Sequence, residues 1–154
     1  MTKLCTALLL VTAIVLAGCG NSKNESLYGT WSATLMTGQA NTPNLAFTAG
    51  FYPGTSGGVN TGNFRITTGN GCFGPDTQVN TSMSASETDL SMALMSAATD
   101  ESGVVVGSSV ISLQGSMVNG SVSGTWTMTS PVALCNASGN LTMTRIPGPA
   151  VTRP

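Results

Sequence analysis

Histidine is absent from this chain of 154 residues, and charged residues make up only 7 % of it. Without histidine the chain lacks the usual general base, the usual catalytic triads and the commonest metal ligand. A formal net charge of -1 without a basic cluster also leaves no electrostatic footprint for DNA or RNA. The sequence therefore favours a non-enzymatic protein with no metal, cofactor or nucleic-acid partner.

Helical periodicity is also missing after residue 26. Short segments of alternating apolar and polar residues are separated instead by Gly, Pro, Asn, Asp and Ser, which turns require. The pattern predicts one all-β domain over residues 27–146, with Gly107 as a site for a bulge in its sixth strand. The expected strands lie near 27–36, 44–52, 62–68, 77–84, 88–96, within 103–115, 120–129 and 139–146.

The number of strands and the short links between them favour an eight-stranded antiparallel up-and-down barrel, with a β-sandwich as the alternative. A closed barrel has no open strand edge, which suits a chain with few charged residues to guard one. Four methionines fall on or near the expected inward faces, namely Met83, Met92, Met128 and Met143. These side chains either fill the interior, line a cavity for a small apolar ligand, or bind Cu(I).

The N-terminal segment is predicted to direct export. Lys3 precedes an apolar run that is too short to span a membrane as a helix, and small residues close the run at Ala17 and Gly18. Residues 1–18 therefore form a signal peptide, and the tail over residues 147–154 is expected to be unpaired because it contains three prolines.

The residues Leu16-Ala17-Gly18-Cys19 resemble the lipobox of bacterial lipoproteins. This resemblance implies that Cys19 receives a diacylglycerol and further acylation such as palmitate, and that the preceding peptide is removed. The alternative is an ordinary signal peptide whose first mature residue happens to be cysteine.

Several acyl chains on one residue are enough for stable anchoring, so we expect a protein that is held on the membrane without spanning it. Residues 19–26 would then form the lipidated end and a flexible tether of at most roughly 25 Å. Gly20 stands where inner-membrane retention in Gram-negative bacteria typically uses Asp. The expected location is the cell envelope, at the outer membrane if the source is Gram-negative.

The remaining cysteines, Cys72 and Cys135, are expected to form a disulfide, because Cys5 leaves with the signal peptide and export places the chain in an oxidising setting. A metal site is the rival interpretation, although two cysteines without histidine make a poor one. In a meander the links after the third and seventh strands share the end opposite the tether. At least one of these links would have to fold across the barrel mouth to bring the sulfur atoms together.

Both tryptophans lie in the triplet Gly-Thr-Trp, at Trp31 and Trp126. The first strand and seventh strand run in the same direction in a meander, and one strand separates them. We therefore expect both rings at the tether-proximal end, at similar heights, as a paired floor of the barrel.

A small exported barrel that opens with Gly29-x-Trp31 resembles the calycins, the superfamily of lipocalins and avidins. In lipocalins this tryptophan closes the barrel floor, so the resemblance implies that role for Trp31. Avidins continue with an Asn and a Ser that bind biotin, and here these positions are Ala33 and Thr37. Biotin binding is therefore not implied.

Two classes of function remain open. The first is a lipid-anchored envelope protein that binds a small apolar ligand inside the barrel or docks another envelope protein. The alternative is a hydrolase that uses Glu87 and Asp89, since alternate residues of a strand share a face. Solvated charges at a turn are the simpler interpretation of this pair.

Overall fold

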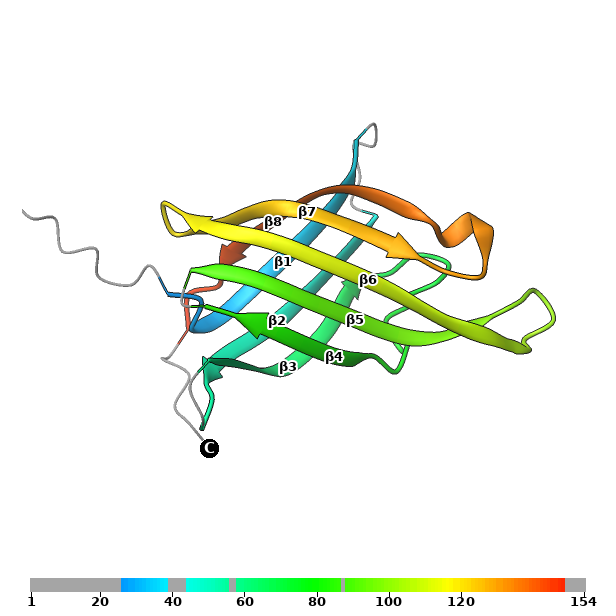
Figure 1. Ribbon diagram of the computed structural model, residues 1–154, viewed down its shortest axis with the longest axis horizontal. Coiled ribbons are helices and arrows are strands. Elements are labelled where there is room, and N and C mark those ends of the chain that lie inside the picture. Colours follow the sequence, from blue (N-terminus) through cyan, green and yellow to red (C-terminus); the bar gives the residue numbers. More distant parts are fainter. Residues whose placement is uncertain (1–25, 39–43, 56–57, 87, 149–154) are drawn as a thin grey trace, which may run out of the picture.

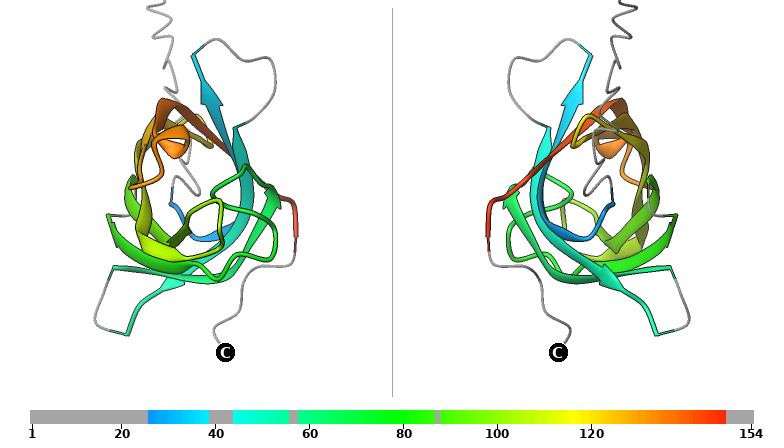
Figure 2. Two further views of the ribbon diagram at one scale, coloured as in Figure 1. Left: turned by 90° about the vertical axis from the view of Figure 1, so that its right-hand side faces the viewer. Right: turned by 90° about the vertical axis from the view of Figure 1, so that its left-hand side faces the viewer.

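A computed structural model describes residues 26–38, 44–55, 58–86 and 88–148 of the chain. Eight antiparallel strands form one sheet that curls into a nearly closed barrel, as Figure 1 shows from the side and Figure 2 from both ends. The all-β barrel prediction is confirmed, and the sandwich alternative is wrong. The elements are β1 (Gly29–Thr37), β2 (Leu45–Pro53), β3 (Val59–Thr68), β4 (Asn80–Ala85), β5 (Asp89–Thr99), β6 (Val105–Val118), β7 (Ser121–Thr129), the 3-10 turn η1 (Ala133–Cys135) and β8 (Ala137–Arg145).

Residues 1–18, Cys19 and the tether up to residue 25 lie outside the described residues, as do Glu87 and residues 149–154. Within the described part of the chain, no helix has both the length and the apolar character needed to cross a membrane.

Alternation of apolar and polar residues builds the core as the sequence predicts. The inward side chains of β2 are fully buried from Leu45 to Phe51, and Met92, Met128 and Met143 are at most 4 % exposed. Met83 is only half-buried. Because successive side chains of a strand point to opposite faces, the intervening Ser and Thr residues cover the outside of the barrel.

Two local devices in the second half of the barrel follow from the sequence. Asn119 and Gly120 both have positive φ, 51° and 76°, and form a two-residue hairpin turn between β6 and β7. The pairing of β5 with β6 shifts between Ala98 and Thr99, opposite Gly107, so the predicted bulge is confirmed there. The bulge does not break β6, which extends three residues beyond the predicted segment, to Val118.

Closure of the barrel is incomplete, and the expectation of a wall without an open edge is wrong. The strand order is β3-β2-β1-β8-β7-β6-β5-β4, so β1 pairs with β8 while β3 and β4 remain the two edges. Two register shifts interrupt the pairing of β3 with β2, and Asn63 in the second has a φ of 50°. Bulges bend and twist a strand, which turns β3 away from alignment with the short strand β4.

The meander gives the barrel two distinct ends. The chain enters at what we call the entry end, together with the β2–β3, β4–β5 and β6–β7 turns, at the left in Figure 1. The opposite end, which we call the mouth, carries the links that follow β1, β3, β5 and β7. This arrangement places the links that contain Cys72 and Cys135 at the same end, as predicted.

Candidate functional site

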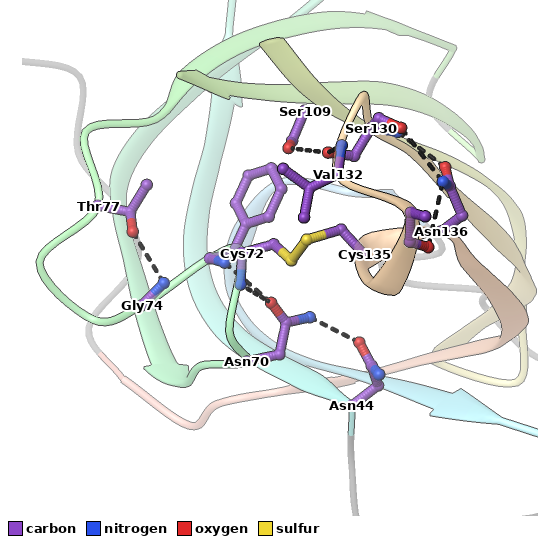
Figure 3. The surroundings of a disulfide bond; sticks show 12 residues. Asn44, Asn70, Cys72, Gly74, Thr77, Ser109, Ser130, Val132, Cys135 and Asn136 are labelled. Atoms are coloured by element: carbon purple, nitrogen blue, oxygen red, sulfur yellow. Dashed lines mark hydrogen bonds between the residues drawn. A yellow bond between two sulfur atoms is a disulfide. The ribbon is translucent and has the colours of Figure 1, made fainter. Parts of the chain in front are cut away.

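A disulfide closes part of the mouth, as Figure 3 shows. Cys72 lies in the link between β3 and β4, and Cys135 ends η1 in the link between β7 and β8. Their Cα atoms are 5.9 Å apart, within the range of a disulfide. The predicted pairing is present, and both links fold inward to make it.

The link between β3 and β4 is held in its folded form by one asparagine. The Oδ1 atom of Asn70 accepts hydrogen bonds from the backbone N–H groups of Cys72, at 2.9 Å, and Phe73, at 2.8 Å. Its Nδ2 atom donates to Oδ1 of Asn44 at 2.7 Å, which ties the link to the start of β2 (Figure 3). Phe73 is fully buried beside the disulfide as a result.

Phe73 was not assigned to the core from the sequence, because it stands in the turn-forming segment "GNGCFGPD" rather than in an alternating strand. The only signal for it was an aromatic residue next to a cysteine expected to be bonded. Burial of a loop aromatic depends on where the loop folds, which strand periodicity does not encode.

Side-chain hydrogen bonds also hold the second link at the mouth, between β7 and β8. The Oδ1 atom of Asn136 accepts from the backbone N–H of Ser130 at 2.8 Å, and its Nδ2 atom donates back to the Ser130 carbonyl at 3.1 Å. Ser130 also bonds by its hydroxyl to the buried Ser109 of β6, at 2.8 Å (Figure 3). The link is thereby attached to the barrel wall as well as to the disulfide.

Apolar surface is exposed around this stapled mouth. A shallow cleft of about 220 Å³ lies beside the disulfide, lined by Met128, Val132, Leu134 and Ala137 among others. Leu134 is 94 % exposed, and the valines from Val104 to Val106, in the hairpin between β5 and β6, are also exposed. The cleft is too small and too open for a drug-sized ligand.

Trp31 lies at the entry end and has no accessible surface. Its indole Nε1 donates to the Leu27 carbonyl at 2.7 Å, and the Arg145 guanidinium stacks over its ring at 4.6 Å from the centroid. The same guanidinium donates to the carbonyls of Tyr28 and Ser26. These contacts fix the point at which the chain enters the barrel.

Trp126 is buried too, but the expectation that it lies level with Trp31 is wrong. It pairs with Gly139, which pairs with Thr37, at the opposite end of β1 from Trp31. The two levels differ by roughly 20 Å along the strand direction. The physical reason is that strands become staggered along their length when a sheet closes into a barrel. The two tryptophans occupy the same position in their sequence motifs, but the motifs do not reveal this stagger.

Gly139 explains how Trp126 reaches so far across the barrel. The indole Nε1 of Trp126 donates to the Met36 carbonyl on β1, at 3.1 Å, over the intervening strand β8. A side chain at Gly139 would collide with that same carbonyl. The inward glycine therefore lets β8 and β1 approach closely beneath the ring.

The interior of the barrel is filled by side chains. Trp31, Phe47, Leu94, Leu113 and Met143 come from five strands and have no accessible surface. A cavity able to hold water or a ligand would expose the side chains that line it. Met92 and Met143 thus pack within the apolar core, Met128 does so while also bordering the cleft at the mouth, and Met83 is only partly buried against the core.

Asp89 is fully exposed at the start of β5, as expected for a turn charge. Its carboxylate accepts hydrogen bonds from the Ser116 hydroxyl at 2.7 Å and the Ser86 hydroxyl at 3.2 Å, and these bonds lower the pKa of Asp89. A general acid in glycoside hydrolysis needs a raised pKa instead. Asp89 borders an open groove of about 590 Å³ on the outer wall, lined by residues of β4, β5, β6 and β7 that include Ser84, Ser91 and Ser123.

Metal-ligating side chains do not cluster in the described ranges, where no three of His, Cys, Asp and Glu come together. The two candidate sites that remain are the mouth, which the disulfide partly closes, and the gap between the unpaired edges of β3 and β4, which we call the seam. Comparison of this chain with protein-family models, with curated proteins and with solved structures yields no match that could assign a role to either of them.

Proposed function

We propose that this protein is a non-enzymatic protein of the bacterial cell envelope, anchored by lipid at Cys19, whose barrel docks a partner on its outside. The observation that carries the docking role is the filled interior, in which inward side chains of five strands have no accessible surface. Because the described side chains pack so closely inside the barrel, we take its ends, its outer wall and its open seam as the surfaces for recognition.

Attachment to the membrane is supported by the lipobox-like residues before Cys19 and by the way the chain enters the barrel. Arg145 and Trp31 hold residues from Ser26 to Tyr28 at the entry end. A tether of at most roughly 25 Å would then keep this end near the membrane and turn the mouth away from it. If the source is Gram-negative, Gly20 favours the outer membrane.

Anchoring predicts a clear result for Cys19→Ser. To avoid retention by an uncleaved signal peptide, residues 1–18 are replaced in this variant by an ordinary cleavable signal sequence. We expect the wild-type protein in the membrane fraction, labelled by an alkyne analogue of palmitate, and the Cys19→Ser protein in the soluble fraction without label. Cys5→Ser is the matched control and should stay anchored. Membrane association of the unlabelled Cys19→Ser protein would contradict the lipid anchor.

The filled interior predicts that no small molecule travels with the folded protein. Native mass spectrometry of the detergent-purified chain should give the mass of the polypeptide and its covalent lipid alone. Denaturing spectra of the same sample provide the control, because a ligand held in the barrel would be lost on unfolding. A bound mass present only in the native spectrum would contradict the docking role and favour a small apolar ligand.

A further inference from the structure

The seam between β3 and β4 leaves two strand edges without backbone partners. In the part of the chain that the structure describes, β3 pairs only with β2 and β4 only with β5, whereas every other strand pairs on both sides. Free N–H and C=O groups along a strand edge are a template for another strand. A segment that covers such an edge must therefore offer backbone N–H and C=O groups of its own.

Core side chains are also partly exposed along this seam. Whereas most inward side chains are buried, those on or next to the two edge strands are only half-buried, namely Val59, Phe64, Val79, Met83 and Ala85. A hollow of about 280 Å³ opens there, lined by Tyr52, Val59, Asn60, Thr61, Thr81 and Met83. The surface of this hollow is mainly polar, and the half-buried apolar side chains lie along the seam beside it. The seam thus combines partly exposed apolar side chains with unpaired backbone on both sides.

Little holds the seam shut. The Thr61 hydroxyl on β3 donates to the Met83 sulfur on β4 at 3.1 Å, and a thioether is a weak acceptor. The disulfide restrains the seam at the mouth, where Cys72 lies in the connecting link, but the entry end has no such tie among the described residues. β4 also lacks the charged residues and prolines that commonly guard an edge.

We infer that this seam accepts a single extended segment of another polypeptide chain, inserted as a strand between β3 and β4. The inference rests on the proposed docking role and names the class of partner. Backbone groups of the segment would pair with both edges, antiparallel to one and parallel to the other. Its alternate side chains would be apolar and would lie over Phe64 and Met83. The two edge strands carry a single charged residue, Arg65 on β3, which fits a segment with little charge of its own.

A lone strand fits this seam better than the sheet edge of a second folded copy. The Thr61 and Met83 side chains are in contact across the seam, so a whole sheet cannot reach the β4 edge without displacing β3. A slender segment entering from the untied entry end needs the Thr61–Met83 contact to part and β3 and β4 to move apart, because some of their Cα atoms lie within 8 Å of each other.

The test uses the full-length protein in detergent and individual fluorescent peptides of about eight residues, in which threonine alternates with Val, Ile, Leu, Phe or Met. We expect saturable binding of at least one peptide by fluorescence anisotropy, and about ten-fold weaker binding when alternate peptide N–H groups are methylated. Hydrogen exchange should show new protection over residues 59–68 and 80–85. Protection at the mouth instead, around Val104–Val106 or Leu134, would overturn the inference.

A covalent lock provides the matched variant. Thr61→Cys and Met83→Cys joined by a short bis-maleimide should abolish peptide binding, while the same reagent joining Ser112→Cys to Thr127→Cys, an exposed pair on the outer wall across β6 and β7, should leave binding unchanged. Equal binding by the locked protein, or no saturable binding of any peptide up to about 1 mM, would overturn the inference. A dimer in which the backbone amides of the seam are already protected from hydrogen exchange would also overturn the inference, because a second copy of the chain would then occupy the seam. None of these results alters the membrane-fractionation or mass-spectrometric tests of the proposed function.

Discussion

Trp126→Ala is expected to lower the free energy of unfolding by about 3 to 5 kcal/mol. The ring is 1 % exposed and spans β8 to bond the partly buried Met36 carbonyl, so its loss leaves a large cavity and removes one hydrogen bond from that carbonyl. Gly139 below the ring has no side chain that could fill part of the space. Urea unfolding of the full-length protein, followed by circular dichroism, measures the change.

Trp126→Phe is the matched control for this prediction. It keeps most of the aromatic bulk and loses the indole N–H, so a smaller loss of about 1 to 3 kcal/mol is expected. Because the register separates the two tryptophans, the effects of Trp31→Phe and Trp126→Phe should add within about 0.5 kcal/mol. Strong coupling between them would contradict the separated arrangement. A loss of less than 1 kcal/mol in Trp126→Ala would contradict the structural role of the ring, whose burial predicts several times that value.

The second large effect is expected from removing the disulfide. Cys72 and Cys135 are separated by 63 positions in the chain, and for a loop of this length the chain-entropy model gives about 4 kcal/mol. We expect the double variant Cys72→Ser and Cys135→Ser to unfold at correspondingly lower urea concentration. Asn70 and Asn136 still fold the two links by their own hydrogen bonds, so the barrel itself should form.

Cys5→Ser is the control for the double cysteine variant, since it removes a thiol that leaves with the predicted signal peptide. Its unfolding curve should match that of the wild type. Peptide mapping under non-reducing conditions should recover Cys72 and Cys135 in one linked pair. Two free thiols in the exported protein, with unchanged stability of the double variant, would contradict the bond.

The chain contains too little charge to protect an open edge by repulsion, yet the barrel has one at the seam. Bulges in β3 and the shortness of β4 explain why the two edges do not pair. Local backbone irregularity therefore explains the incomplete closure. The apolar pattern does not explain it, because the apolar residues of both β3 and β4 face inward. The partner that we propose would therefore dock where the strand geometry leaves β3 and β4 unpaired.

Alternation and turn chemistry were sufficient to predict most of the fold. The period of two residues assigned the inward faces of β1, β2 and β5, and the Asn119-Gly120 pair marked its hairpin, because both signals act between near neighbours in the chain. The order of the strands then placed Cys72 and Cys135 at one end without any distance being known.

The sequence by itself thus determined the all-β class, the meander, the core faces and the cysteine pairing. Only the tertiary structure decided that Trp126 lies away from Trp31, that Phe73 enters the core from a loop, and that β3 and β4 fail to pair. Each of these depends on stagger between strands, on bulges or on the path of a link. Such features are set by how distant segments pack together, and a short-range periodic pattern carries no information about them.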